Sequence, residues 1–263
     1  MTPLTECAFA TAFRSVAIVA AAVLAGGPGV RAEREDLLVS VAASLKGAMD
    51  EVVERYGALY PATEVALNAA ASGVLLSQTE HGAPVDLFIS ASSSEIDRLE
   101  TKGLVRARQA IASGEIVVAV PKGTSPPGNF AGVADARFGR IAVGNPSTVP
   151  VGRYARESLQ ALGVWEILEP RLVFAADARQ VLDWIERGEV DAGVLYGTDA
   201  LAGSGRVVAG PAAPAGSHAR ILYEGAVLEN SAGARSALHL LEFLRSEAGQ
   251  EILARRGFLP APR

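Results

Sequence analysis

The feature that most constrains the fold of this chain is an alternation of short apolar runs with segments of helical periodicity. Residues 37–41 form an apolar run typical of a buried strand, and from Leu45 to Tyr56 apolar residues recur with a helical period of 3.6. The same pattern predicts further strands at 65–67, 86–90, 116–120, 141–143, 172–174, 192–196 and 221–228. It predicts further helices at 74–80, 95–102, 154–162, 178–187, 234–244 and 250–255. Such alternation is typical of an α/β protein whose mostly parallel sheets carry helices on both faces.

The length of 263 residues fits one large domain or two small ones. Two stretches rich in Pro, Gly and Ala, residues 121–128 and 210–217, are expected to be loops near the crossings between domains. The C-terminal helices are too few to build a core of their own, so we expect them to pack on the first lobe. We therefore predict two α/β lobes joined by two crossing segments. The first lobe comprises residues 33–114 and 219–263, and the second lobe comprises residues 115–218.

The N-terminal 32 residues have the pattern of a secretory signal peptide. Arg14 precedes an apolar stretch at 16–24, and the small residues Val30 and Ala32 suit signal peptidase. A permanent membrane anchor is the alternative, but the stretch is about half of the roughly 20 residues that a spanning helix needs. Cys7 lies before the apolar stretch, whereas a lipid-anchoring cysteine would follow it at the cleavage point. The sequence predicts a cleaved leader at 1–32 and an exported, cysteine-free mature protein.

Charge and metal-ligand content exclude two classes of function. With 24 Lys and Arg against 29 Asp and Glu, the formal net charge is -5, and no run of like charges indicates a nucleic-acid surface. His81, His218 and His239 are too scattered for a zinc site. We expect neither a nucleic-acid partner nor a metal ion held directly by side chains.

Ligands of open α/β sheets bind beyond the carboxyl ends of strands, so the loops that follow the strands are the places to search. Ser44 and Ser72 each stand between a predicted strand and the next helix, among small residues that let backbone N–H groups approach a ligand. Simple helix capping is the alternative explanation of each serine.

Three more positions follow strands farther along the chain. Val151 lies where the Pro-containing loop 144–152 enters a helix, Ala178 follows Asp177 at another helix start, and Tyr196 ends a strand. The alternatives are a rigid connecting loop, an N-cap at Asp177 and a half-buried tyrosine. Helix N-termini that meet in one crevice would form an anion site, because each presents N–H donors and a partial positive charge. Uncharged donors of this kind also fit a chain with a net negative charge.

At these positions the sequence resembles the periplasmic molybdate-binding proteins, the solute receptors of ABC-type molybdate importers. The resemblance covers essentially the whole mature chain. Its motifs are AASL at 42–45, GAPVDLFIS at 82–90, AVGNP at 142–146 followed by Val149 and Pro150, and VLYGTDA at 194–200.

The resemblance implies a type II periplasmic-binding-protein fold with a hinge that closes two lobes over an oxyanion. It implies that the ligand is held by Ser44 and Ser72 through hydroxyl and N–H groups, by Val151 and Ala178 through backbone N–H groups, and by Tyr196 through its hydroxyl. Two side chains, at Val151 and Ala178, differ from those typical of the family. Ala71 and Gly73 stand where family members often have more serines.

The resulting expectation is a monomeric, exported receptor without a cofactor that delivers molybdate or tungstate to a membrane permease. The five positions include no acidic proton acceptor, which disfavours hydrogen phosphate, whereas sulfate or another solute remains open as the alternative ligand. A serine hydrolase using Ser44 or Ser72 is disfavoured because the Gly-x-Ser-x-Gly elbow is missing. An effector-sensing domain of a transcription regulator is disfavoured because a leader stands where a helix-turn-helix would be needed.

Overall fold

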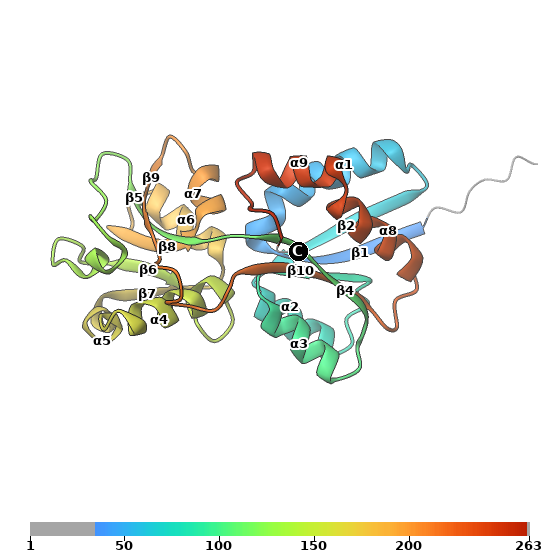
Figure 1. The fold of residues 1–263 in the computed structure, drawn as a ribbon, viewed down its shortest axis with the longest axis horizontal. Coiled ribbons are helices and arrows are strands. Elements are labelled where there is room, and N and C mark those ends of the chain that lie inside the picture. The colour runs from blue at the N-terminus through green and yellow to red at the C-terminus, as the bar shows by residue number, and fades with distance from the viewer. Residues whose placement is uncertain (1–34, 262–263) are drawn as a thin grey trace, which may run out of the picture. The chain divides into compact units, whose positions relative to one another are not determined.

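A computed structural model describes residues 35–261, so the predicted leader at 1–32 lies outside the described residues. Two five-stranded sheets organise this part of the chain (Figure 1). The first sheet has the order β2-β1-β3-β10-β4. Its strands are β1 (Glu35–Ala42), β2 (Thr63–Ala70), β3 (Leu87–Ser90), β4 (Val105–Ser113) and β10 (Leu222–Leu228). Strands β2, β1 and β3 are parallel, and β10 is antiparallel to both of its neighbours.

The second sheet repeats this topology with the order β7-β6-β8-β5-β9. Its strands are β5 (Ile116–Pro121), β6 (Ile141–Gly144), β7 (Leu172–Ala175), β8 (Ala192–Tyr196) and β9 (Val207–Ala212). Strands β7, β6 and β8 are parallel, and β5 is antiparallel to β8 and β9. Every residue of β3, β6 and β8 is buried, as continuous apolar runs require when helices cover both faces of a sheet.

Helices cover the two faces of the first sheet and complete what we call the first lobe. Helices α2 (Ser72–Glu80) and α3 (Ser93–Thr101) pack on one face, where Phe88 joins their apolar residues. The other face carries the 3-10 turn η1 (Ala43–Leu45) with α1 (Lys46–Leu59), α8 (Ala234–Arg245) and α9 (Glu247–Arg255). Leu87 and Ile89 point into the core on that side, as strand alternation dictates. The prediction that the C-terminal helices pack on the first lobe is confirmed, because α8 contacts β4 and β10 and α9 contacts α1.

The second lobe is built in the same way around its sheet. Helix α4 (Pro150–Ala161) packs on one face, followed by the short α5 (Trp165–Leu168) and the 3-10 turn η3 (Glu169–Arg171). Helices α6 (Ala178–Glu186) and α7 (Gly197–Ala202) pack on the other face. Another 3-10 turn, η2 (Phe130–Ala134), lies beside β5 and β9.

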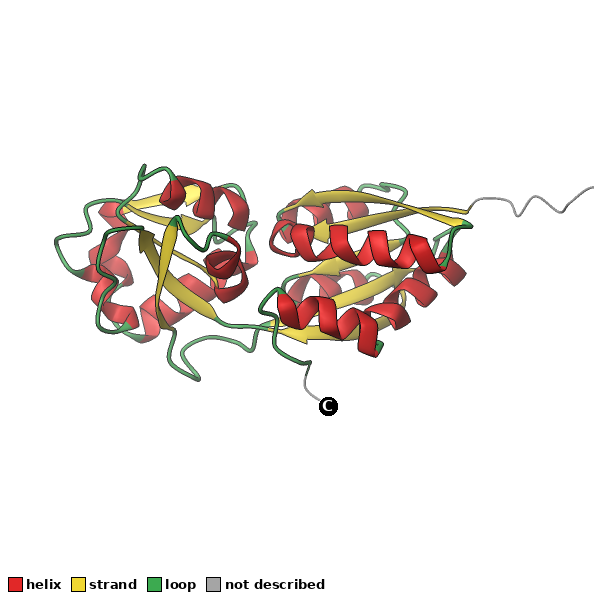
Figure 2. Cartoon of the chain, turned by 90° about the horizontal axis from the view of Figure 1, so that it is seen from above, coloured by secondary structure: helices red, strands yellow, loops and turns green. Residues whose placement is uncertain are grey.

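Two connections carry the chain between the lobes, as Figures 1 and 2 show. The first runs directly from β4 through Gly114 into β5, and the second leads from β9 through residues 213–221 into β10. The expectation that residues 121–128 lie near a crossing is wrong, because this loop connects β5 to η2 within the second lobe. Its prolines have a packing role there: a Cβ on Gly210 would lie 2.8 Å from Cβ of Pro126.

Candidate ligand-binding site

The register of the first sheet places Ser44 and Ser72 at neighbouring strand ends. Val41 of β1 pairs with Ala69 of β2, so the two strands end side by side before η1 and α2 begin. Capping does not explain either serine. The N-cap residue of η1 is Ala42, that of α2 is Ala71, and neither helix start has a side-chain capping bond. The capping alternative is therefore wrong for both residues.

The hydroxyls of the two serines are buried and keep donor capacity. Ser72 is fully buried, and its Oγ accepts a hydrogen bond from the Ala91 N–H at 3.2 Å. Since a hydroxyl carries one proton and two lone pairs, this bond leaves the Ser72 proton for another acceptor. Among the described residues, the buried Ser44 Oγ has no hydrogen-bond partner. A buried hydroxyl without a partner is costly in a folded protein, so Ser44 is a candidate to bind a ligand.

In the second lobe, two glycines allow a helix start to approach a strand end closely. The loop after β6 leads to Val149, the N-cap of α4, with Pro150 as the first helical residue. A Cβ on Gly152 would lie 2.0 Å from the Gly144 carbonyl oxygen, so a side chain at this position is excluded. The N–H groups of Gly152 and Arg153 bond to the Val149 oxygen. Helix geometry leaves the first-turn N–H of Val151 without an intrahelical acceptor.

Ala178 and Tyr196 complete the set of predicted positions. Asp177 is the N-cap of α6 and accepts a hydrogen bond from the Gln180 N–H at 2.9 Å, so the capping explanation of Asp177 is confirmed. Ala178 is the first residue of that helix and is buried. Tyr196 ends β8, and its hydroxyl donates to the Ala91 carbonyl of the first lobe at 3.4 Å. Burial, together with the nearby Tyr223 hydroxyl, raises the pKa of Tyr196 well above its ordinary value, so it stays a neutral donor.

A small cavity brings four of the five predicted residues together. Ser44, Ser72, Ala178 and Tyr196 line a space of about 10 Å³ between the lobes. The remaining lining residues are Ala42, Ala43, Ala71, Ala91, Val149 and Pro150. Val151 is fully buried and does not line the cavity, although the two residues before it do. A space of this size holds about one water molecule, so a larger ligand requires the walls to move apart.

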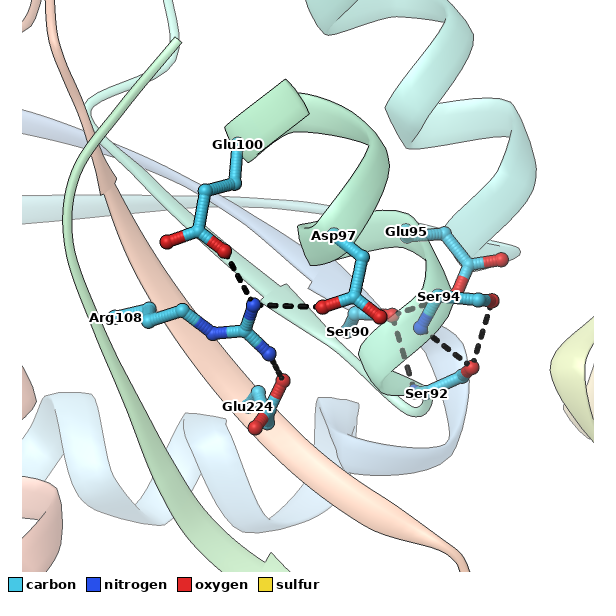
Figure 3. Close-up of polar contacts among 8 residues, drawn as sticks. All are labelled: Ser90, Ser92, Ser94, Glu95, Asp97, Glu100, Arg108 and Glu224. Atoms are coloured by element: carbon cyan, nitrogen blue, oxygen red, sulfur yellow. Dashed lines mark hydrogen bonds and ion pairs between the residues drawn. The ribbon is translucent and has the colours of Figure 1, made fainter. Parts of the chain in front are cut away.

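Contacts between the lobes surround this cavity. The Gly73 N–H donates to the Thr148 carbonyl oxygen at 3.0 Å, which joins the start of α2 to the loop before α4. Arg153 of α4 forms an ion pair with Glu95 of α3 and a 3.1 Å hydrogen bond with the Ser94 hydroxyl. Figure 3 shows the first-lobe partners of Glu95, the hydroxyls of Ser90 and Ser94, each 3.2 Å from Oε2.

A second network in Figure 3 fixes α3 to its sheet and lies outside the cavity. Arg108 of β4 donates to Asp97 and Glu100 of α3 and to Glu224 of β10. Burial lowers the pKa of Arg108, but the hydrogen bonds to these carboxylates outweigh it and raise the pKa above its usual range. This network is structural.

Sequence reasoning missed a group of buried polar residues beside the cavity. Ser44 also lines a larger cavity of about 900 Å³, together with Thr198 and Asp199 of α7 and with Arg179 of α6. Burial raises the pKa of Asp199 to about 7 against the opposing charge of Arg179. Tyr223 of β10 is fully buried close to these residues. Thr198 and Asp199 belong to the motif at 194–200, but only their burial identifies them as unusual.

Two general features of the described residues concern metals and membranes. Between residues 35 and 261, His, Cys, Asp and Glu side chains form no group of three or more that could hold a metal ion. In the same range no helix combines the length and apolar character of a membrane span.

Comparison with known proteins assigns this chain to a family. The family model described as bacterial extracellular solute-binding protein matches residues 37–259. The molybdate-binding protein ModA of Escherichia coli is 35% identical over 237 residues, which cover 86% of this chain and 90% of that protein.

Two solved structures share the fold. The periplasmic molybdate-binding protein of Azotobacter vinelandii has a TM-score of 0.76 at 21% identity and covers 86% of this chain and 100% of that one. The sulfate-binding protein SubI of Mycobacterium tuberculosis has a TM-score of 0.75 at 17% identity, with coverage of 86% and 87%. The predicted two-lobed periplasmic-binding-protein fold is thereby confirmed. Since the family model spans most of the chain, this protein belongs to the bacterial extracellular solute-binding proteins.

Proposed function

We propose that this protein captures molybdate or tungstate between its two lobes and delivers it to the membrane permease of an ABC importer. The observation that carries the proposal is a cavity at several strand ends whose polar groups are uncharged donors, beginning with the unpartnered Ser44 hydroxyl. The similarity to the ModA protein supports the choice of ligand.

The five residues would share the oxygens of a tetrahedral dianion. Ser44 and Ser72 would donate through hydroxyl and N–H groups, and Val151 and Ala178 through backbone N–H groups. Tyr196 would donate through its hydroxyl, whose single proton would turn from the Ala91 carbonyl to the ligand. A dehydrated dianion needs every oxygen paired, because a buried unpaired charge is prohibitive. Charge-assisted hydrogen bonds from neutral donors meet this need without adding a cation. For Val151 this role requires its N–H to reach the ligand although its side chain stands outside the cavity wall.

Capture would proceed by hinge closure of the lobes. The hinge would join a first lobe of residues 33–114 and 219–263 to a second lobe of residues 115–218. Because the cavity has a volume of only about 10 Å³, an oxyanion would enter while the lobes are apart. The permease would then recognise the closed form.

The remaining features follow from the receptor role. The residues 1–32 would be a cleaved signal peptide, and the mature protein would act in the periplasm as a monomer without a cofactor. It would not be an enzyme, since its part is to bind and release an unchanged ion.

Sulfate is the second candidate ligand, because the sulfate-binding protein shares the fold and sulfate has the same charge and shape. Phosphate is disfavoured, since a protonated ligand would lack a proton acceptor among the five residues.

Calorimetric titration with molybdate, tungstate, sulfate and phosphate tests the proposal. We expect saturable one-to-one binding of molybdate and tungstate. Ser44→Ala should weaken it by about 1.5 to 3 kcal/mol, the contribution of one hydrogen bond to a charged group. Ser77→Ala is the matched control, because Ser77 lies on the exposed side of α2. A wild-type chain that prefers sulfate would refute the proposed ligand. A Ser44→Ala variant with unchanged affinity would refute the proposed site.

A further inference from the structure

Three buried hydroxyls meet at the boundary between the lobes without completing hydrogen bonds. Ser44 Oγ comes from η1, Thr198 Oγ1 from α7 and Tyr223 Oη from β10. Ser44 and Thr198 line one cavity, and both lie close enough to the Tyr223 hydroxyl to lower its pKa. Within the described part of the chain, none of the three atoms has a partner at hydrogen-bonding geometry. Because unmade bonds of buried hydroxyls are unfavourable, a small movement that closes them would be favoured.

The ring of Tyr223 is held where both connections between the lobes pass. It packs edge-to-face on Phe258, with ring centroids 4.8 Å apart, and lies 5.6 Å from the ring of Tyr196. Gly114, which stands between β4 and β5, would place a Cβ 3.1 Å from Tyr223 Cε2. Tyr223 itself is the second residue of β10, directly after the other connection. This packing fixes the ring of Tyr223, whose hydroxyl lies near Ser44 and Thr198.

Because a hydroxyl has one proton to donate and lone pairs to accept, the three hydroxyls can form hydrogen bonds in a defined order. If Ser44 donates its single proton to an oxyanion, its oxygen is left to accept a hydrogen bond. The Tyr223 O–H can supply that bond, and the Tyr223 oxygen can in turn accept from the Thr198 O–H. Burial, and next the charge of Asp199, raise the pKa of Tyr223 well above its ordinary value, so its proton remains available. Hydrogen bonds aligned in this way polarise one another.

We propose that Thr198, Tyr223 and Ser44 form a chain of hydroxyl donors that orients the Ser44 O–H toward the bound oxyanion, with Tyr223 as the positioning residue. This inference rests on the proposed function, because it requires Ser44 to donate to the ligand. It assigns part of the affinity to two side chains that do not touch the anion. It also links a ligand donor of the first lobe to the second lobe at the hinge.

The test measures molybdate affinity by calorimetry and thermal stability without ligand on the same variants of the mature chain. Tyr223→Phe should weaken binding about tenfold, the effect of losing one hydrogen bond. It should leave the melting temperature of the ligand-free protein unchanged or higher, because the removed hydroxyl has no partner there. Thr198→Val should weaken binding in the same way, and Thr198→Ser should restore it relative to Thr198→Val. Tyr60→Phe, at the exposed end of α1, is the matched control and should bind like the wild type.

A double-mutant cycle with Ser44→Ala decides whether the effect passes through Ser44. In the Ser44→Ala background, Tyr223→Phe should cause no further loss of affinity. An equal loss in both backgrounds, or a Tyr223→Phe variant that binds like the wild type, would overturn the hydroxyl chain. A loss of affinity that accompanies a lower melting temperature in both Tyr223→Phe and Thr198→Val would assign these residues a structural role instead.

The same measurements separate the two proposals. A wild-type chain that binds sulfate but not molybdate overturns the proposed ligand, and the cycle measured with sulfate still decides on the hydroxyl chain. A wild-type chain that binds none of the four oxyanions overturns both.

Discussion

Arg153 of α4 donates to the carboxylate of Glu95 in α3, and this ion pair joins the two lobes beside the candidate site. The Glu95 side chain is 4% exposed and is further held by the hydroxyls of Ser90 and Ser94 (Figure 3). Arg153 stands two residues after Val151, so the pair fixes the first turn of α4 against the first lobe. Arg153 therefore supplies the cation that pairs with a nearly buried carboxylate.

Replacing Arg153 by Met should therefore weaken oxyanion binding. In the closed form the substitution leaves the buried Glu95 carboxylate without its cation, whereas in an open form Glu95 is solvated by water. Because Arg153 is 28% exposed, we expect a loss of about 1 to 2 kcal/mol in the binding free energy, measured by calorimetry. Arg106→Met is the control: Arg106 and its partner Glu229 are both largely exposed, so binding should not change. Wild-type affinity in Arg153→Met would show that the pair does not support closure.

Gly73→Ala should hinder closure of the lobes. A Cβ at this position would lie 2.5 Å from the carbonyl oxygen and 2.9 Å from the Cα of Thr148, both backbone atoms of the second lobe. We expect a lower affinity for the oxyanion and, by small-angle X-ray scattering, a larger radius of gyration in saturating ligand than that of the wild type. Gly57→Ala in α1 has nothing within 4 Å of its Cβ and should bind normally, with stability raised by about 0.5 to 1 kcal/mol. Identical scattering of loaded Gly73→Ala and wild type would contradict the expectation.

Much of the fold could be predicted because its central strands are almost entirely apolar. Strands β3, β6 and β8 are buried on both faces and, apart from Ser90 at the end of β3, appear in the sequence as apolar runs. Of the edge strands of the two sheets, β2 and β7 are among the predicted strands, whereas β4 and β9 are not. Arg106 and Arg108 interrupt the apolar pattern of β4, and Gly210 and Pro211 interrupt that of β9. Arg108 fits its strand only through Asp97, Glu100 and Glu224, and such distant partners cannot be inferred from local sequence.

The residues of the candidate site that lie at the ends of strands could be predicted. Ser44, Ser72 and Ala178 follow strands of the two sheets, Tyr196 ends a strand, and all four line one cavity. The buried polar group formed by Thr198 and Tyr223 could not be predicted, because a missing hydrogen bond depends on the packing of segments far apart in the chain. Local sequence also leaves helix capping open as an alternative for both serines, whereas in the structure alanines occupy the N-cap positions.

Asp86→Asn should destabilise the first lobe without affecting the ligand site. Asp86 Oδ2 accepts from the Leu38 N–H at 2.8 Å, and Oδ1 accepts from the Ser231 hydroxyl at 2.6 Å and the Gly233 N–H at 3.2 Å. An amide turns one of these acceptors into a donor, so we expect a loss of about 2 to 3 kcal/mol in the free energy of unfolding in urea. Asp50→Asn, in an exposed pair with Lys46, should cost about 0.5 kcal/mol or less. Equal effects of the two substitutions would refute a structural role for Asp86.

Asp199→Asn should change how stability depends on pH. The pKa of Asp199 is about 7 in the folded protein, mainly because of burial, against an ordinary value of 3.8 that we assign to the unfolded chain. Between these values the folded state keeps a proton that the unfolded state has lost, so its contribution to stability declines as the pH rises and is lost above about pH 7. The loss amounts to at most about 4 kcal/mol. Unfolding in urea at pH 4.5, 5.5, 6.5 and 8, conditions we choose to bracket this window, should show the variant gaining stability relative to the wild type toward high pH. Asp183→Asn, on the exposed surface of α6, is the control, and its stability should depend on pH as that of the wild type does. If the stability of Asp199→Asn and of the wild type changed in parallel with pH, Asp199 would not titrate in this range.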